Sequence, residues 1–392
     1  MQQPEPEPSL SQDDIRADVN ALVRSAVQAT LETVMKEAVD LIVRAQPHER
    51  SDARRDVRNG SYGRRLMTTV GSIDLDVPRT RTRGTASAVI GRYERRTPEI
   101  DAAITEAYVG GISTRKMKGV TKALLGKGVG RSAVSRVTAK LEEQVDALRR
   151  APISEPIIYL YLDATFLNAR WARQVENVSA LVAYGVGADG KRQLLAVTIG
   201  VSESEESWTD LLQQLLARGL HGVRLVISDA HLGLKAAVRR LLPELPHQRC
   251  TVHLTRNIIA KTPQRLRGRV AREAVRILHA PSLAEAKKRK AEFNEGLGAQ
   301  VPEARACLDA GFDAATRYYA FPKVHWKRIR STNGIERLHG EIKRRIKSIG
   351  AFPDRASALR LITAVALQTT AIWSDRRYLD VTQHVEAHTS HD

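Results

Sequence analysis

The strongest constraint on the fold of this chain is a group of four apolar, β-rich runs. They cover 157–163, 178–187, 192–201 and 223–229, and a helical pattern fills 205–218. Short connections between the first three runs are typical of antiparallel neighbours, whereas a helical crossover leads to a parallel strand. The first and fourth runs are almost continuously apolar, which indicates central strands. The sequence therefore predicts an α/β fold around a mixed sheet.

Two of these runs end in an aspartate, Asp163 and Asp229, and a third acid, Glu336, lies in the basic helical segment RSTNGIERLHGEIKRRIKSIGAFP. Parallel neighbouring strands would bring both aspartates to the edge of the sheet where open α/β sheets bind ligands. Three carboxylates within about 4 Å repel by roughly 4 kcal/mol at a dielectric near 20, a penalty that cations reverse. Oxygen ligands suit Mg²⁺, and two such ions can clamp a phosphoryl displacement. We predict that all three acids are catalytic and bind Mg²⁺, for which Mn²⁺ is expected to substitute.

Each acid also has a purely structural interpretation. Asp229 fits the N-cap of a helix that begins near His231, and Glu336 fits a capping box with Asn333. Asp163 could be a polar strand end. These alternatives stay open at the level of sequence.

The helix that carries Glu336 is expected to have two different faces. A buried stripe is predicted at Ile335, Leu338, Ile342, Ile346 and Ile349. Glu336, His339, Lys343 and Lys347 would then stack along an adjacent face, because residues three or four apart are neighbours on a helix. We expect DNA contacts from this region at Arg330, Arg337, His339, Lys343 and Lys347.

The formal net charge of +18 and the isoelectric point near 10.1 indicate a polyanionic partner. Residues 155–230 are acidic, with 6 Lys/Arg against 9 Asp/Glu, whereas 256–290 have 11 against 2 and 327–347 have 8 against 2. This pattern favours nucleic acid over a membrane. With two cysteines and no apolar signal or membrane segment, the expected location is the cytoplasm, in contact with the nucleoid.

Residues 1–50 are predicted to form an amphipathic helix with an apolar stripe at Leu22, Val23, Ala26, Val34, Ala38 and Leu41. The stripe packs either on a partner subunit or on its own chain, and both options stay open.

Residues 51–150 are predicted to form a DNA-binding region. A hairpin is expected from 62–69 and 72–78, followed by arginines suited to backbone phosphates at Arg79, Arg81 and Arg83. Helices capped by Ser113 and Ser132 and joined by the turn GKGVG favour a helix-turn-helix. Its second helix would present Arg131, Ser135, Arg136 and Lys140 to the major groove. An ordinary helical hairpin is the alternative.

The core is predicted at 151–253 and 326–392, with an all-helical insertion at 254–325. His247, Cys250 and His253 have ligand-like spacing, but a structural zinc site usually needs four ligands. We favour a packed junction, from which His253 would reach DNA. Trp326 could stack on an unpaired base, although packing in the core is the stronger expectation.

The motifs YLDATF, SESEESW, VISDAHLGL, QRCTVH and the Glu336 segment occur in this order. Together they resemble the bacterial Mutator-type insertion-sequence transposases. The resemblance implies an RNase H-like core in which Asp163, Asp229 and Glu336 form an Asp-Asp-Glu metal site. It also implies that the N-terminal third recognises terminal inverted repeats and that Cys250 and His253 form the C-x-x-H feature of the family. Residues 164–166, Gly334 and His339 depart from the commoner choices.

On these grounds we predict a DNA transposase that binds the terminal inverted repeats, cleaves a strand at each end and transfers the 3′-hydroxyl to target DNA. A homo-oligomer is expected, most simply a dimer, because two element ends must meet. No membrane partner is expected. The alternatives are an RNase H-like nuclease or resolvase without strand transfer, and a transposase-derived DNA-binding regulator that does not cut.

Overall fold

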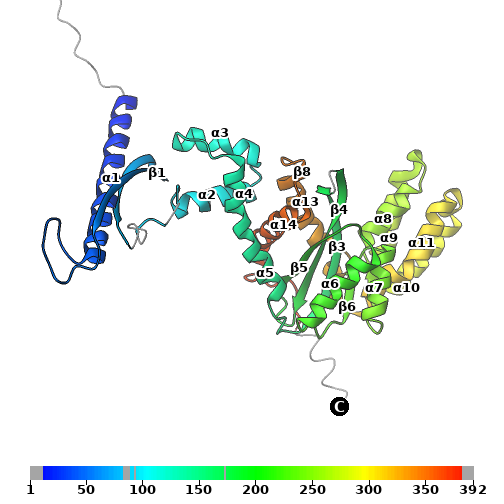
Figure 1. Cartoon of the computed structure of the whole chain (residues 1–392). Helices are drawn as coiled ribbons and strands as arrows, with labels where there is room; N and C mark the ends of the chain where they lie inside the picture. Colours follow the sequence, from blue (N-terminus) through cyan, green and yellow to red (C-terminus); the bar gives the residue numbers. More distant parts are fainter. Residues whose placement is uncertain (1–11, 83–88, 92–93, 172–173, 382–392) are drawn as a thin grey trace, which may run out of the picture. The chain divides into compact units, whose positions relative to one another are not determined.

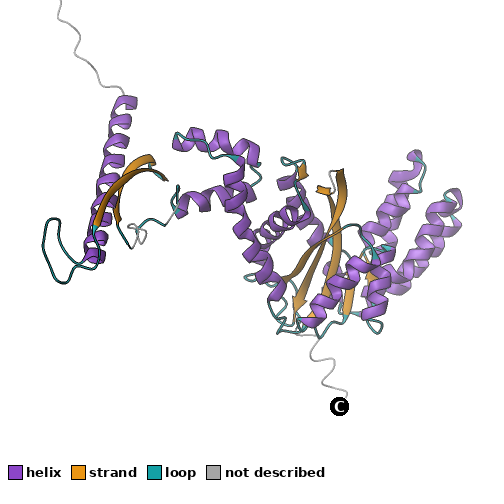
Figure 2. Cartoon of the chain, viewed as in Figure 1, coloured by secondary structure: helices purple, strands orange, loops and turns teal. Residues whose placement is uncertain are grey.

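The computed structural model describes residues 12–82, 89–91, 94–171 and 174–381. The chain divides into two compact units, Met1–Thr138 and Ala139–Asp392 (Figures 1 and 2). The predicted boundary between the DNA-binding region and the core was residue 150. Each unit has its own apolar core, so each is described by itself.

A long helix and a hairpin form the first half of the N-terminal unit. Helix α1 is Gln12–Val43, and β1 (Arg58–Thr68) pairs antiparallel with β2 (Gly71–Thr80), which confirms the predicted hairpin. The helix packs on the hairpin through Met35, Val39 and Val43, which are at most 2% exposed. The opposing hairpin side chains are Leu66, Ile73, Leu75 and Val77.

The apolar stripe predicted for α1 was wrong in its phase. Leu22 is 71% exposed and Leu41 is 80% exposed, whereas the buried contact runs along Met35, Val39 and Val43. The C-terminal half of the helix therefore packs on its own chain. Periodicity alone missed this because several faces of the helix carry apolar residues.

Three helices complete the unit, namely α2 (Pro98–Val109), α3 (Thr114–Leu125) and α4 (Arg131–Thr138). Ser113 caps α3 as predicted, since its hydroxyl accepts the Lys116 N–H at 3.4 Å. Ser132 does not cap α4, because the helix already begins at Arg131. The turn between α3 and α4 starts at Gly126 with φ of +72°, a conformation that glycine adopts at little cost.

In the described part of the chain, the C-terminal unit contains a six-stranded mixed sheet. Its strands are β3 (Ile157–Trp171), β4 (Gln174–Gly187), β5 (Arg192–Gly200), β6 (Leu225–Ser228), β7 (His247–Arg249) and β8 (Ala351–Phe352). The order is β5-β4-β3-β6-β7, and β8 pairs with β3. Strands β3, β4 and β5 are antiparallel neighbours, whereas β6 is parallel to both β3 and β7. The predicted mixed sheet with β3 and β6 at its centre is confirmed.

The first strand is longer than predicted. Asp163 was expected to end it, but β3 continues to Trp171 and pairs with β4 along this extension. Asp163 therefore projects from within a strand, where it is paired with Val182 of β4.

Helices cover both faces of the sheet (Figure 1). One face packs Leu160, Leu162 and Val226 against α6 (Glu205–Ala217) and α7 (Leu232–Leu241). Successive side chains in a strand alternate between faces, so Tyr161 and Asp163 face the opposite layer. That layer consists of α12 (Trp326–Ile329), α13 (Asn333–Ile346) and α14 (Arg355–Thr370), and the Tyr161 hydroxyl donates to the carbonyl of Arg328 at 3.4 Å. Helix α5 (Glu142–Arg150) packs against α14.

The predicted helical block is present between β7 and α12. It contains α8 (Thr251–Ala260), α9 (Arg267–Leu278), α10 (Leu283–Glu295) and α11 (Pro302–Ala315), which lie side by side in Figure 1. Its separate apolar core includes Ile258, Val270, Ile277, Leu308 and Phe312. Short 3₁₀ turns lie at Ala139–Leu141, Gln264–Leu266, Leu297–Gln300, Arg317–Ala320, Lys323–His325 and Ala371–Trp373.

Among the described residues, the segment Arg355–Trp373 alone is long and apolar enough to pass a test for a membrane span. Most of it, 61%, is buried inside the molecule. Its apolar side chains already have a partner in the sheet, as in the core helix of a globular domain.

Candidate active site

The sheet brings two of the three predicted acids to the same level. Strands β3 and β6 pair in parallel with Tyr159 opposite Leu225 and Tyr161 opposite Ile227. Continuing this register by two residues places Asp163 level with Asp229, because both strands advance in the same direction. The two carboxylates therefore come from β3 and from the residue that follows its neighbour β6.

Asp163 is an acid held out of water. It is 6% exposed, and its Oδ1 accepts its neighbour's N–H, that of Ala164, at 3.1 Å. Burial raises the pKa of Asp163 from 3.8 to about 7, and the charges of Asp229 and Glu336 raise this pKa further, whereas His253 opposes the rise. The charges of Asp229 and Glu336 thus act on Asp163.

Asp229 follows β6. It partly fills the role of a helix cap, which was its structural alternative. Its Oδ1 accepts the His231 N–H at 3.0 Å just before α7. A further acid, Glu203, lies nearby in the loop after β5, with an oxygen 3.7 Å from His231 Nδ1. Burial raises the pKa of Glu203 to about 7, and the charge of Asp229 adds to this effect. Negative charge therefore extends beyond the three predicted acids.

Glu336 is held by two cationic side chains from α8. Arg256 donates to both carboxylate oxygens, at 2.9 and 3.3 Å, and His253 Nε2 lies 3.7 Å from Oε1. The capping box with Asn333 is not formed in the described structure, where α13 begins after Thr332 and the Glu336 side chain points to α8. That structural alternative is wrong.

Cys250 joins the parts of the chain that carry these groups. Its backbone N–H donates to the carbonyl of Ser228, next to Asp229, at 2.7 Å. Its sulfur accepts from the backbone N–H and the hydroxyl of Thr332, at 3.4 and 3.5 Å, where α13 begins. Because Cys250 also precedes α8, this one buried residue fixes β6, α8 and α13 relative to one another.

His253 has a raised pKa. Interaction with the Cys250 side chain is the main reason that its pKa rises to about 9, and Asp163 and Asp229 add to the rise. The expected packed junction at Cys250 and His253 is observed. His247 points elsewhere, since its Nε2 lies 2.6 Å from the Ser228 hydroxyl.

His339 lies elsewhere than predicted. It is 6% exposed, and its Nδ1 lies 3.6 Å from Asp163 Oδ2. Burial, together with the charge of Lys343, lowers the pKa of His339 to about 3, so the imidazole is neutral. The reason is the phase of α13, which turns His339 into the core beside Ile335 and Leu338.

Among the described residues, no three His, Cys, Asp or Glu side chains stand close enough together to hold a metal ion as they are. One of the acids already has a cationic partner, because Arg256 engages both oxygens of Glu336. Asp229 and Glu336 are therefore near enough to affect the pKa of Asp163, but the three side chains do not have the geometry of metal ligands.

The other residues expected to contact DNA near the acids differ in exposure. Arg337, Lys343 and Lys347 are exposed, and Arg330 is half-buried. Trp326 is half-buried, with its Nε1 donating to the Phe321 carbonyl at 2.7 Å and its ring against Tyr319 at 4.7 Å. The packing interpretation of Trp326 agrees with these contacts.

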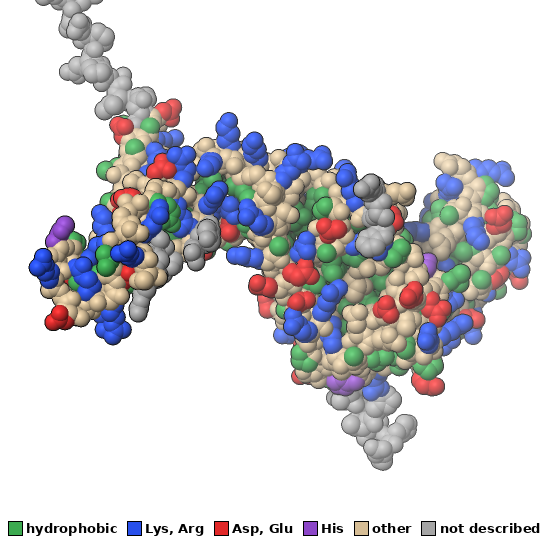
Figure 3. All heavy atoms as spheres, in the orientation of Figure 1, with side chains coloured by type: hydrophobic (Ala, Val, Ile, Leu, Met, Phe, Trp, Pro, Cys, Tyr) green, Lys and Arg blue, Asp and Glu red, His purple; other side chains and the backbone are tan. Residues whose placement is uncertain are grey.

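In the N-terminal unit, the predicted reading face of α4 is exposed at Arg131, Ser135 and Arg136. Lys140 is also exposed but belongs to the C-terminal unit. Arg79 lies over the Tyr62 ring at 4.5 Å, and Arg81 is exposed. Arg83 lies outside the described residues. Figure 3 shows Lys and Arg side chains gathered over the region of α3 and α4.

Sequence reasoning missed Arg256, Glu203 and Thr332. Arg256 falls three residues after His253, one helical turn further on, and Glu203 lies within the quoted motif SESEESW. Helical spacing could therefore have indicated Arg256, and the motif could have indicated Glu203. Thr332 had none, because its contact with Cys250 joins residues far apart in the chain.

Comparison with known proteins agrees with the sequence motifs. A transposase for insertion sequence element ISRM5 from Rhizobium meliloti (strain 1021) is 35% identical over 361 residues, covering 92% of this chain and 90% of the relative. A transposase for insertion sequence element IS256 in transposon Tn4001 from Staphylococcus aureus is 36% identical over 383 residues, covering 95% and 98%. A transposase for insertion sequence element IS1081 from Mycobacterium tuberculosis (strain ATCC 25618 / H37Rv) is 33% identical over 361 residues, covering 91% and 87%.

Among solved structures, a simian T-cell lymphotropic virus intasome aligns with 46% of this chain and 69% of its own, at 11% identity. Its TM-score of 0.17 is too low to support an argument about the fold. The family described as "Transposase, Mutator family" matches residues 2–375. With this match and relatives at 33–36% identity over most of their length, the chain belongs to the Mutator family of transposases.

Proposed function

We propose that this transposase uses an RNase H-like core and an Asp-Asp-Glu site. It would bind the terminal inverted repeats of its element, cleave a DNA strand at each end with two divalent metal ions, and transfer the 3′-hydroxyl to target DNA. The observation that carries the proposal is the parallel register of β3 and β6, which brings Asp163, an acid 6% exposed, level with Asp229. Mutually repelling acids in a buried place are costly unless a cation joins them.

The donor chemistry of the three acids suits Mg²⁺, with Mn²⁺ as an expected substitute. Asp163, Asp229 and Glu336 supply carboxylate oxygens, the ligands that hard divalent cations prefer. When bound, the metal ions would activate water and stabilise charge on the transferred phosphoryl group. In the same neighbourhood, His253 and Arg256 supply the positive charge that now faces the acids.

Arg256 is proposed to change partner during the reaction. Its guanidinium is 59% exposed and occupies both oxygens of Glu336. An arriving phosphodiester offers the same bidentate geometry as a carboxylate, so Arg256 can move from Glu336 to DNA. This exchange would release Glu336 for the metal only when DNA is present.

DNA is proposed to contact two sets of residues. Near the acids these are Arg330, Arg337, Lys343, Lys347 and His253, with Trp326 in a packing role beside them. His339, which is buried, would instead orient Asp163 as a neutral imidazole. Within residues 51–150 the proposed contacts are Arg79, Arg81, Arg83, Arg131, Ser135, Arg136 and Lys140, with α3 and α4 as a helix-turn-helix.

The decisive experiment is cleavage of labelled duplexes that carry the ends of the element. The wild type should nick them only with Mg²⁺ or Mn²⁺ and should then join the freed 3′-hydroxyl to a target plasmid. Nicking without joining would instead favour a nuclease or resolvase, and metal-independent binding without nicking would favour a regulator. Because two ends must meet, we also propose a homodimer, which light scattering on the DNA complex would detect.

A further inference from the structure

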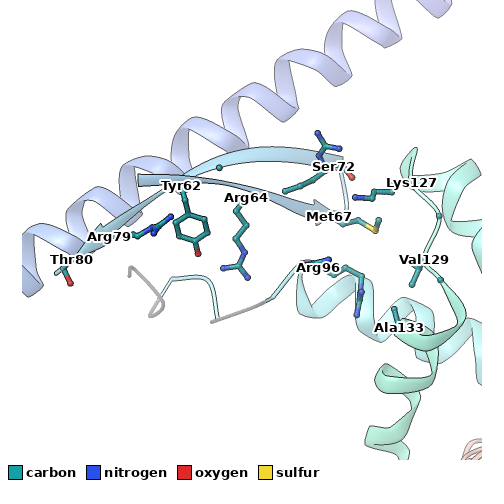
Figure 4. A pocket seen from close by; sticks show the side chains of 15 residues that line it. Tyr62, Arg64, Met67, Ser72, Arg79, Thr80, Arg96, Lys127, Val129 and Ala133 are labelled. Atoms are coloured by element: carbon teal, nitrogen blue, oxygen red, sulfur yellow. The ribbon is translucent and has the colours of Figure 1, made fainter. Parts of the chain in front are cut away.

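A cleft of about 780 Å³ lies between the hairpin and the turn that precedes α4 (Figure 4). Tyr62, Arg64 and Arg79 extend from the hairpin on one side, and Lys127 approaches from the turn. The described residues that line the cleft include no Asp or Glu. Its basic side chains are Arg64, Arg65, Arg79, Arg95, Arg96 and Lys127.

Only part of this positive charge is neutralised within the described structure. Arg65 pairs with Asp74 at 2.7 Å and Arg96 pairs with Asp101 at 2.5 Å. Among the described residues, no carboxylate lies within ion-pair distance of Arg79, Arg95 or Lys127, and these three side chains are exposed. The cleft therefore keeps a surplus of cations that a bound anion would neutralise.

The cations are held in place by the local structure. Arg79 lies over the Tyr62 ring at 4.5 Å, which positions its guanidinium by a cation–π contact. The Val129 N–H donates to the Thr121 hydroxyl at 2.8 Å, which ties the turn to α3. A side chain at Gly128 would meet Lys118 Cγ at 2.7 Å and its carbonyl oxygen at 2.9 Å. The turn that carries Lys127 thus packs directly on α3.

The hairpin side of the cleft is also fixed. The Met67 N–H donates to the Arg95 carbonyl at 2.9 Å, and the Thr97 N–H donates to the Met67 carbonyl at 3.0 Å. These bonds set Arg95 beside β1. A concave surface with fixed guanidinium groups and no acid in its described lining matches the charge and the oxygen geometry of phosphodiesters.

We propose that this cleft binds the sugar-phosphate backbone of DNA next to the exposed face of α4, and that it does so without regard to base sequence. The inference rests on the proposed function in taking DNA as the polyanion. In this proposal the hairpin and the GKGVG turn bind phosphates. This function is separate from any contact of Arg131, Ser135 and Arg136 with the bases.

The test compares the salt dependence of DNA binding in full-length variants. Fluorescence anisotropy with a labelled duplex of arbitrary sequence, and a second duplex with the element end, gives the slope of log affinity against log salt. Arg79→Ala with Lys127→Ala should lower the slope by about 0.9 for each phosphate that is no longer neutralised and should weaken both duplexes by the same factor. Lys127→Ala alone changes an exposed turn residue and should give about half of this effect.

A matched control removes the same charge outside the cleft. Arg16→Ala with Arg50→Ala, both exposed in the same unit, should leave the slope unchanged. An unchanged slope in the cleft variants, or a weakening confined to the element-end duplex, would overturn the proposal. A wild type that binds DNA without ever cutting it would defeat the proposed catalytic function, while the slope comparison would still decide the role of the cleft.

Discussion

The acids around Asp163 and the basic cleft of the N-terminal unit carry opposite charge and differ in their exposure to water. Asp163 is a buried acid with two further acids near it, and burial is the main reason that its pKa reaches about 7. In the cleft of the N-terminal unit, arginine and lysine side chains are gathered at an exposed surface. Buried charges interact strongly and depend on specific partners, whereas exposed charges are screened by water and salt. Changes at the acids should therefore abolish chemistry, and changes at the cleft should weaken binding by degrees.

The largest effect is expected from removing the charge of one acid. Asp163→Asn, Asp229→Asn and Glu336→Gln should each fold and should lower the Mg²⁺-dependent cleavage rate by roughly three orders of magnitude, since an amide cannot serve as an anionic metal ligand. Single-turnover cleavage at saturating DNA measures this. The cleft variant Arg79→Ala with Lys127→Ala should keep its rate at saturation. A variant acid that cuts at the wild-type rate removes that residue from the site.

The stability of the metal-free protein should fall as pH rises through the range in which Asp163 titrates. Its pKa is raised from 3.8 to about 7 on folding, so between these values the folded state holds a proton that the unfolded chain has released. The contribution of this carboxyl to the free energy of unfolding is then greatest below pH 4 and is lost by pH 7. Denaturant midpoints across this range should show the decline in the wild type and less of it in Asp163→Asn.

Mg²⁺ should counteract this decline. Added at pH 8, it should raise the denaturation midpoint of the wild type but not of Asp163→Asn, because the anionic ligand is missing. Equal stabilisation of both proteins would show that the cation binds elsewhere.

Replacing Cys250 should affect catalysis indirectly, because this residue positions the start of α13 relative to β6 and α8. Cys250→Ala removes the acceptor for the N–H and hydroxyl of Thr332, at a cost of about 1 kcal/mol for a typical hydrogen bond, and should lower kcat roughly five-fold with KM little changed. Cys250→Ser, which restores an acceptor, should recover part of the rate. Cys307→Ala in the helical block is the control. If the two Cys250 variants behave alike, the hydrogen bonds are not the reason for the effect.

The smallest effect is expected at Arg256, a cationic residue that pairs with one of the three acids, Glu336. Arg256→Gln should strengthen Mn²⁺ binding to the DNA-free protein by roughly two- to five-fold, because its ion pair with Glu336 is partly exposed and therefore modest. The same variant should bind cleavage-site DNA more weakly. Titration calorimetry with Mn²⁺ measures the first effect, and the exposed Arg265→Gln is the control. Weaker Mn²⁺ binding would contradict the proposed exchange of partners.

Much of the fold could be predicted from local patterns. Apolar β-rich runs and short connections predicted the mixed sheet with β3 and β6 at its centre, and helical periodicity predicted the block after β7. The length of β3 and the buried face of α1 could not be predicted, because pairing with β4 and packing against the hairpin decided them. The local composition of a segment does not show which distant segment it will pair with or pack against.

By itself, the sequence determined the family, the order of the first four strands of the core with the helix between them, and the three acids that serve as candidates, because motifs and periodicity are properties of contiguous residues. Only the tertiary structure decided that His339 is buried beside Asp163, that Arg256 occupies Glu336, and that Cys250 joins β6 to the start of α13. These contacts link residues from distant segments, and their energies depend on burial and distance. Both quantities exist only once the chain has folded.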